Sequence, residues 1–504
     1  MNKLYQKECE SSLEYILPDY MGDIKKILSV NAFATPTGKF ASESAVVFSG
    51  TVFYEVLYAD TDDVLTKISA SSDYEVKQTV DGGEYIDSVI EPKVSATSIR
   101  LSGPRKAHLS ANVSSLVRVT LEDELTPSGD AFGLDAPLET VSEEIKIEST
   151  KFASANEKEY RAEAQRLTGI LADDIDVITT SGAVNIFESE PREGGLLVKG
   201  EVVITSIIKT DDLPPFAIKK SIPFEELISV SEFEAEGGVA RAYVRQAGAG
   251  AADEEGEAVF SVFAVVDFAA ALGKNEEISV IKDAYLPSRD TEGKYSSLSY
   301  DELCKMGNFE LEVEAKLDRA VLGLENAREI LFARAVPSSI EVTKSSTGAK
   351  IDGDISFSGV ACEIKEDSTP LYIPIKCSSP FAAFVNLNCQ FPENSALECK
   401  AVSALCDALI NDGELLLKTK LSLEYRVHIP KSVKRMTECS LVGDGEYSKS
   451  SSEILVYYPD STETLFSVAK KYHTTSAKIA EDNRLAIETS ALDSAAIPKR
   501  LIIK

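Results

Sequence analysis

The sequence predicts a mainly β protein, built from three tandem β-sandwich-like repeats that are joined by short linking helices. Runs rich in valine, isoleucine and aromatic residues, which favour strands, follow glycines at several points of the chain. Other runs alternate strictly between apolar and polar residues, the period of a strand with one buried face. A chain of 504 residues also exceeds one hydrophobic core, so three or four domains are expected.

A pair of landmarks, a glycine that starts an apolar run and a later aromatic residue, recurs three times. The distance between the two members is 24, 24 and 22 residues in the pairs Gly50 with Tyr74, Gly200 with Phe224, and Gly359 with Phe381. This agreement predicts a repeat of about 150 residues.

Each repeat is expected to begin with a helix and to close on a strand. An Ile-Leu pair lies ahead of each glycine, at residues 16–17, 170–171 and 330–331, and a charged, helix-favouring stretch such as residues 157–166 precedes it. The clearest closing strand is residues 417–429, where apolar and polar residues alternate.

The chain changes character at residue 453. Residues 454–458 read as a strand, residues 462–472 as a helix capped by Thr462, residues 476–483 as a second helix, and residues 501–503 as a closing strand. Leu465, Phe466, Ala469 and Tyr472 give the first helix an apolar stripe at helical spacing. The pattern predicts a small α+β module of βααβ order.

Charge and hydropathy narrow the classes of partner. With 52 Lys and Arg against 82 Asp and Glu, the net charge of −30 repels phosphate backbones, so no nucleic-acid partner is expected. The first residues carry no apolar run of signal-peptide length, and no 18 consecutive residues are apolar. We therefore expect no membrane insertion and a cytoplasmic location.

Enzymatic chemistry is not indicated. The sequence has no phosphate-binding loop, nucleophile elbow, zinc-protease helix or dinucleotide fingerprint, and it has only three histidines. No catalytic residue, metal ligand or cofactor is predicted, and the chain is expected not to be an enzyme. Its eight cysteines form no C-x-x-C pair; we interpret most of them as small buried apolar residues, with disulfides and metal binding as the alternatives.

The C-terminal module resembles a LysM domain. The residues that match the LysM signature are Thr464, Leu465, Phe466, Val468, Ala469, Lys470, Lys471, Tyr472, Asn483, Pro498, Leu501 and Ile503. The resemblance implies a shallow groove that binds a protein or an N-acetylglucosamine glycan, formed by Ser461, Thr462, Glu463, Thr464, Leu465, Phe466, Asn483, Arg484, Leu485, Ile497, Pro498 and Lys499. Thr462, His473 and Lys499 replace glycines of the signature, and their side chains would stand where a sugar approaches backbone.

Upstream of this module, the repeats resemble the spore-coat-assembly (SPOCS) domains of SipL-like spore-morphogenesis proteins. The expected domains are residues 1–150, 155–300 and 315–445 for the repeats and residues 453–504 for LysM. The resemblance implies a scaffold in the mother-cell cytosol at the forespore surface. Its LysM domain would dock to a coat-basement ATPase, and its repeats to other coat proteins. The alternative is a peptidoglycan-binding protein of the cell envelope, which would require export.

Overall fold

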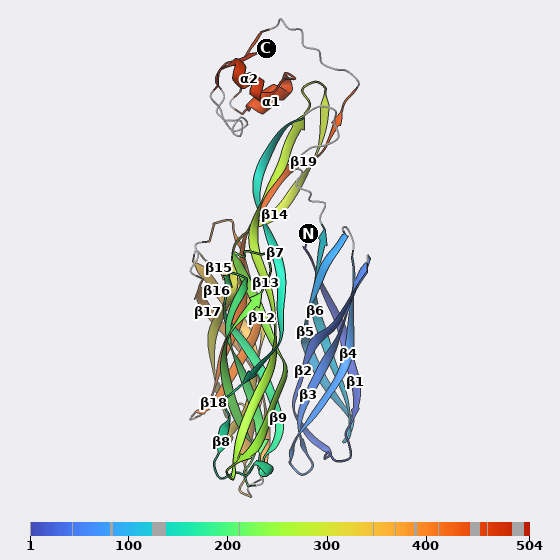
Figure 1. Ribbon diagram of the computed structural model, residues 1–504. Helices are drawn as coiled ribbons and strands as arrows, with labels where there is room; N and C mark the ends of the chain where they lie inside the picture. Colours follow the sequence, from blue (N-terminus) through green and yellow to red (C-terminus); the bar gives the residue numbers. More distant parts are fainter. Residues whose placement is uncertain are drawn as a thin grey trace. The chain divides into compact units, whose positions relative to one another are not determined.

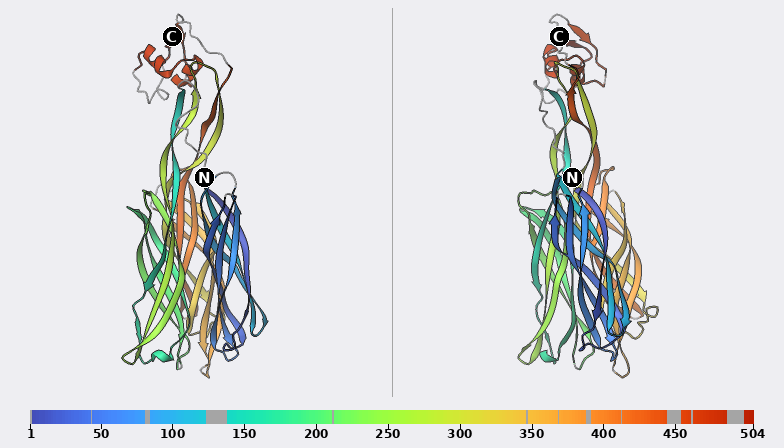
Figure 2. Two further views of the ribbon diagram at one scale, coloured as in Figure 1. Left: turned by 45° about the vertical axis from the view of Figure 1, so that its right-hand side comes forward. Right: turned by 90° about the vertical axis from the view of Figure 1, so that its right-hand side faces the viewer.

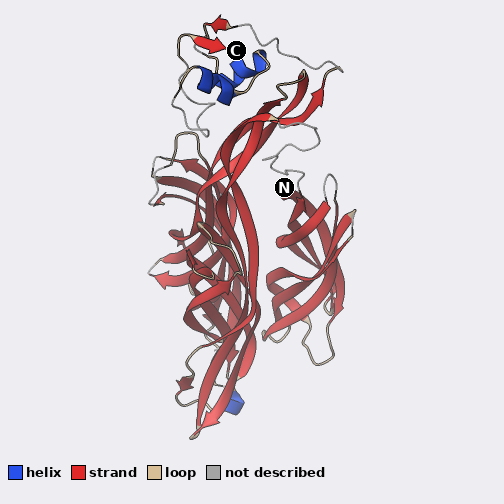
Figure 3. Ribbon diagram, turned by 45° about the horizontal axis from the view of Figure 1, so that its top comes forward, coloured by secondary structure: helices blue, strands red, loops and turns tan. Residues whose placement is uncertain are grey.

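The computed structural model describes residues 2–42, 44–80, 84–122, 138–210, 212–345, 347–367, 369–387, 391–411, 413–443, 454–460, 462–485 and 498–504 (Figure 1). It confirms that the protein is mainly β, with several antiparallel sheets. The linking helices were predicted wrongly. Residues 157–166 lie mostly in strands, and the helices of the described residues are a 3-10 turn at Ala172–Asp174 and two short helices near the C-terminus (Figure 3).

The first repeat is a sandwich of two three-stranded sheets. Its strands are β1 (Asn2–Ile16), β2 (Ile24–Ala41), β3 (Ala45–Asp60), β4 (Leu65–Thr79), β5 (Glu84–Gly103) and β6 (Lys106–Glu122). One sheet has the order β2-β3-β4 and the other β1-β6-β5. Apolar side chains from both sheets, among them Val52, Tyr54, Leu109 and Val113, form one buried core.

The second and third repeats have the same plan. The second contains β7 (Glu139–Arg161), β8 (Gln165–Leu167), β9 (Asp176–Arg192), β10 (Gly195–Lys209), β11 (Phe216–Ser229), β12 (Gly237–Glu254) and β13 (Glu257–Tyr285). The third contains β14 (Thr291–Asp318), β15 (Glu329–Lys344), β16 (Gly348–Ile364), β17 (Pro370–Asn386), β18 (Ala396–Asn411) and β19 (Glu414–Leu441). Each has a meander sheet, β9-β10-β11 or β15-β16-β17, and its first strand pairs with its last strand, β7 with β13 or β14 with β19.

The strand pairing places the starts of the second and third repeats earlier in the chain than the sequence predicted. Residues 151–154, between the first two expected repeats, lie inside β7, and residues 301–314, between the second and third, lie inside β14. Since β7 and β14 are the first strands of their repeats, the second and third repeats begin near residues 139 and 291.

The glycine and aromatic landmarks are cross-strand pairs. Gly50 lies opposite Tyr74, and Gly200 lies opposite Phe224, as a repeat with constant spacing requires. In the third repeat the predicted glycine was wrong, because Phe381 lies opposite Gly353 and Gly359 lies opposite Ile375. In each repeat the aromatic ring covers its glycine so closely that an added Cβ would lie within 3.0 Å of a ring carbon.

Replacing Gly200 with alanine tests this packing. The new Cβ would lie 2.2 Å from the Asn185 carbonyl oxygen and 2.5 Å from the Phe224 ring. Because a backbone carbonyl cannot rotate away, we expect Gly200→Ala to destabilise the protein by about 1–3 kcal/mol in urea unfolding. Gly250→Ala, in the same repeat and with open space around the new Cβ, is the matched control. Equal unfolding midpoints for the two variants would contradict the prediction.

The chain divides into two compact units, which are described separately. The first contains the described residues of 1–124, 150–274 and 304–427, and the second those of 125–149, 275–303 and 428–504. In the first unit the last strand of each meander contacts the first strand of the next repeat's meander: β4 meets β9, β11 meets β15, and β17 meets β2. The three meanders therefore close on one another in a ring. Figure 2 shows two side views of the strands of the three repeats, coloured blue, green and yellow to orange.

A shared core fills the centre of this ring. The first strand of each meander has a β-bulge at the same place, and the extra residues, Leu28, Ile178 and Leu331, all join one apolar cluster. Beside them in the same cluster lie Leu57, Ile207 and Val360, each seven residues after the glycine of its landmark pair. Because the repeats bury these side chains only against one another, the ring is part of their folding core.

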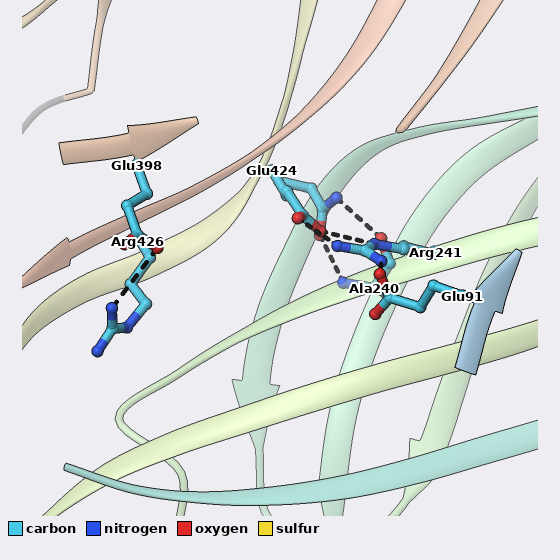
Figure 4. A network of polar contacts seen from close by, with 7 residues as sticks. Glu91, Ala240, Arg241, Glu398, Glu424 and Arg426 are labelled. Atoms are coloured by element: carbon cyan, nitrogen blue, oxygen red, sulfur yellow. Dashed lines mark hydrogen bonds and ion pairs between the residues drawn. The ribbon is translucent and has the colours of Figure 1, made fainter. Parts of the chain in front are cut away.

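Arg241 of β12 joins the three repeats through charge (Figure 4). Its guanidinium Nε donates a 2.8 Å hydrogen bond to Glu424 of β19, and Nη1 forms an ion pair with Glu91 of β5. Glu424 is only 11% exposed at its side chain, so the pair is largely shielded from water. Next to it, Asn308 of β14 bonds both the N–H and the C=O of Ala240, at 2.7 and 2.9 Å.

The second unit combines the ends of four strands with the C-terminal module, defined as residues 454–504. Residues of β7, β13, β14 and β19 supply the strand part, whose small core contains Ile145, Val280 and Val433. The module contains β20 (Leu455–Tyr457), α1 (Leu465–Lys471), α2 (Ser476–Asp482) and β21 (Leu501–Ile503), and β20 pairs antiparallel with β21.

Candidate binding module at the C-terminus

The two helices of the module start at threonine caps. The Thr464 hydroxyl accepts a 3.2 Å hydrogen bond from the Ser467 N–H, and the Ser467 hydroxyl accepts one of 2.9 Å from the Thr464 N–H. The predicted cap, Thr462, lies two residues too early, because Thr464 can form this reciprocal box and Thr462 does not. Thr475 caps α2 by accepting from the Lys478 N–H at 3.1 Å.

Asn483 holds the closing strand. Its amide accepts from the Ile502 N–H and donates to the Ile502 carbonyl, both at 2.7 Å, and it also donates to the Ile479 carbonyl at the end of α2. The side chain thus occupies the outer edge of β21 as a neighbouring strand would. These bonds use the amide oxygen and both amide hydrogens, so Asn483 is a structural residue of the module.

Glu463 is also engaged inside the module. Its carboxylate accepts from the Asp460 N–H at 2.9 Å and from the Tyr457 hydroxyl at 2.8 Å, and these bonds, the first most strongly, lower the pKa of Glu463. Lys471 donates to the same Tyr457 hydroxyl at 2.9 Å, while the Tyr457 ring packs edge-on against Tyr472. This chain of contacts fixes the loop ahead of α1 against β20.

The predicted apolar stripe is turned inward. Leu465 and Phe466 are 0% and 5% exposed and belong to a core with Val468, Ile479 and Leu501. Phe466 packs edge-on against Tyr285 at the end of β13, with 5.1 Å between ring centroids. Tyr285 is itself 1% exposed, and its hydroxyl donates a 2.7 Å bond to the Thr474 carbonyl. The strand ends and the module therefore share one core.

An ion pair lies beside this aromatic contact. Lys470, in the last turn of α1, donates to both carboxylate oxygens of Asp283 at 2.7 Å. The Tyr295 hydroxyl donates to Asp283 at 2.8 Å, and burial followed by this bond raises the pKa of Tyr295 to about 12. The contact combines an apolar centre with a charged rim.

Of the predicted groove, only part can meet a ligand. Ser461 and Ile497 lie outside the described residues. Leu465 and Phe466 are buried, and Glu463, Thr464 and Asn483 bond within the module. Leu485 and Pro498 are half-buried, whereas Thr462, Arg484 and Lys499 are exposed. The exposed part is small, polar and positively charged.

Asp283 and Tyr285 could not be identified from the sequence as residues that contact the module. They lie at the end of β13, 187 and 181 residues before their partners Lys470 and Phe466. The contact between Tyr285 and Phe466 joins two segments that are distant in the sequence, so it becomes visible only in the folded structure.

Other site chemistry is sparse in the part of the chain that the structure describes. No group of three or more His, Cys, Asp or Glu could hold a metal ion among these residues. The seven cysteines described form no disulfide, and burial raises the pKa of Cys362 and Cys406 to about 11 and that of Cys399 to about 12. No described helix is long and apolar enough to cross a membrane.

Comparison with known proteins adds no assignment: no family model, curated protein or solved structure gives a significant match to this chain.

Proposed function

We propose that this chain is a non-enzymatic scaffold of spore-coat assembly, similar to SipL-like proteins. Its C-terminal module is LysM-like and docks a protein of the coat basement, an ATPase by that resemblance. The ring of three repeats offers surfaces to other coat proteins, and the chain works in the mother-cell cytosol at the forespore surface.

The main support for this proposal is the order of elements in the C-terminal module and the contacts of the module with the strand ends of the second unit. The order β20-α1-α2-β21 agrees with a LysM-like module, and Phe466 and Lys470 are engaged by Tyr285 and Asp283 of the chain's own strand. The exposed cations Arg484 and Lys499 suit docking of an acidic protein surface. A sugar would need open aromatic and backbone groups, which the described groove residues do not offer.

The packing of the three repeats on one another also supports the proposed scaffold role. Their inner apolar residues are used in the shared core, and Arg241 and Asn308 tie strands of different repeats. The outer sheet faces then present fixed surfaces for partners.

The test uses the full-length chain, immobilised in lysate of sporulating cells, together with sedimentation on purified peptidoglycan. We expect capture of a coat-basement ATPase, with retention reduced at least about tenfold by Arg484→Glu combined with Lys499→Glu, because two charge reversals in a docking patch remove favourable contacts and add repulsion. Lys77→Glu, a charge reversal at an exposed site of the first repeat, is the control and should retain the partner.

Peptidoglycan binding without capture of the ATPase would overturn the proposal and favour the cell-envelope alternative. If the variant with both Arg484→Glu and Lys499→Glu captures the ATPase as well as the wild-type chain does, the module is not the docking site.

A further inference from the structure

The sheet of the module has one capped edge and one open edge. Val456 lies opposite Ile502, whose N–H and C=O are both bonded to Asn483. In an antiparallel pair, a residue that bonds outward does not exchange bonds with the residue opposite it. The N–H and C=O of Val456 therefore also point outward, away from β21, on the side of β20 that has no neighbouring strand among the described residues.

This open edge is apolar and uncharged. Val456 of β20 is 48% exposed, and Ile454 and Tyr458, which flank the strand on either side, are each 68% exposed. If pairing extends the strand by one residue at each end, the three side chains share one face. The segment 454–458 contains no charged residue and no proline. Native edge strands are usually protected by shortness, lysine, proline or a bulge. β20 is short, with three residues, but no charge, proline or bulge blocks its open edge, which marks it as a pairing surface.

We infer that β20 pairs antiparallel with β20 of a second copy of this chain, giving a two-fold dimer with a continuous sheet β21-β20-β20-β21. Centred on Val456, this arrangement lets each Val456 exchange both backbone bonds with its equivalent. It also sets Ile454 opposite Tyr458 of the second copy on the exposed face, a β-branched and aromatic pair that favours strand pairing. The edge is thus complementary to itself, as a closed two-fold contact requires.

Charge distribution favours a second copy meeting at this place. Residues 454–504 contain seven Lys and Arg and six Asp and Glu, so the net charge of −30 is carried by the rest of the chain. Two copies repel each other through their acidic repeats but not through their nearly neutral modules. The inference does not depend on the proposed coat partner, because the exposed Arg484 and Lys499 lie outside β20.

Sedimentation velocity of the full-length chain over a wide concentration range tests the pairing. We expect a reversible monomer–dimer equilibrium. Val456→Pro removes the outward N–H of each copy and leaves the bonds between β20 and β21, and it should raise the dissociation constant at least about tenfold, since both central bonds are lost. Val456→Lys, which sets two like charges opposite each other, should do the same.

Val321→Lys is the matched control, because Val321 is 82% exposed but lies in the first unit. It should leave the dissociation constant unchanged. A wild-type chain that stays monomeric throughout, or a dimer that neither Val456 variant weakens, would overturn the inference. Because the proposed function is tested by capture of another protein, failure of either test is distinguishable from failure of the other.

Discussion

Replacing Arg241 with methionine is expected to lower the free energy of unfolding of the first unit by about 2–4 kcal/mol. The substitution keeps much of the aliphatic stem but leaves the Glu424 carboxylate, 11% exposed, without its guanidinium partner. A carboxylate held out of water and unpaired is costly, whereas Glu91, at 35% exposure, can regain water. Urea unfolding followed by circular dichroism measures the change.

Two further variants separate this cause from a general loss of charge. Arg192→Met removes the same charge from an exposed pair with Glu190 and should cost less than about 1 kcal/mol. In Arg241→Met combined with Glu424→Leu, both charges are gone and much of the lost stability should return. If Arg241→Met and Arg192→Met unfold at the same denaturant concentration, Arg241 is not the tie between the repeats.

The repeats could be predicted from the sequence to the extent that local patterns specify them. Two of three glycine and aromatic pairs were identified correctly, because a glycine beneath a ring is a local requirement at fixed spacing. The third was assigned to Gly359 rather than Gly353, since the third meander has a longer interval and both glycines precede apolar runs. Apolar spacing alone does not say which residue lies opposite which.

The ring of repeats could not be predicted. Leu28, Ile178 and Leu331 each lie in an ordinary apolar run, and only the bulge that turns them outward from their own sandwich sends them into a shared core. The charged stretch 157–166 favours a helix by local propensity, yet it lies in strands because pairing with β13 satisfies its backbone. Long-range pairing determined both outcomes.

For the candidate site, the sequence located the helices but not their surroundings. The stripe of Leu465, Phe466 and Ala469 is buried as helical spacing predicts. Phe466 was nevertheless assigned to an open groove, because its partner Tyr285 belongs to a distant strand. This contact makes Tyr285 the residue whose removal should have the second large effect.

Tyr285→Ala is expected to weaken the attachment of the module to the strand ends of the second unit by about 3–5 kcal/mol. The variant removes a buried ring from the core with Phe466 and also the hydroxyl that bonds the Thr474 carbonyl. Amide hydrogen exchange of the full-length chain should then speed up in α1 and around Thr474, since local opening would need less free energy.

Tyr285→Phe is the matched control, because it keeps the ring and removes only the hydrogen bond, so its loss should be about 0.5–1.5 kcal/mol. Lys470→Met should fall between the two, since Asp283 keeps the Tyr295 hydroxyl and is 27% exposed. The expected loss of stability is therefore largest for Tyr285→Ala, intermediate for Lys470→Met and smallest for Tyr285→Phe, because the contact has an apolar centre and a charged rim. Unchanged exchange in α1 of Tyr285→Ala would instead mean that the core of the module holds without its contact to the strand.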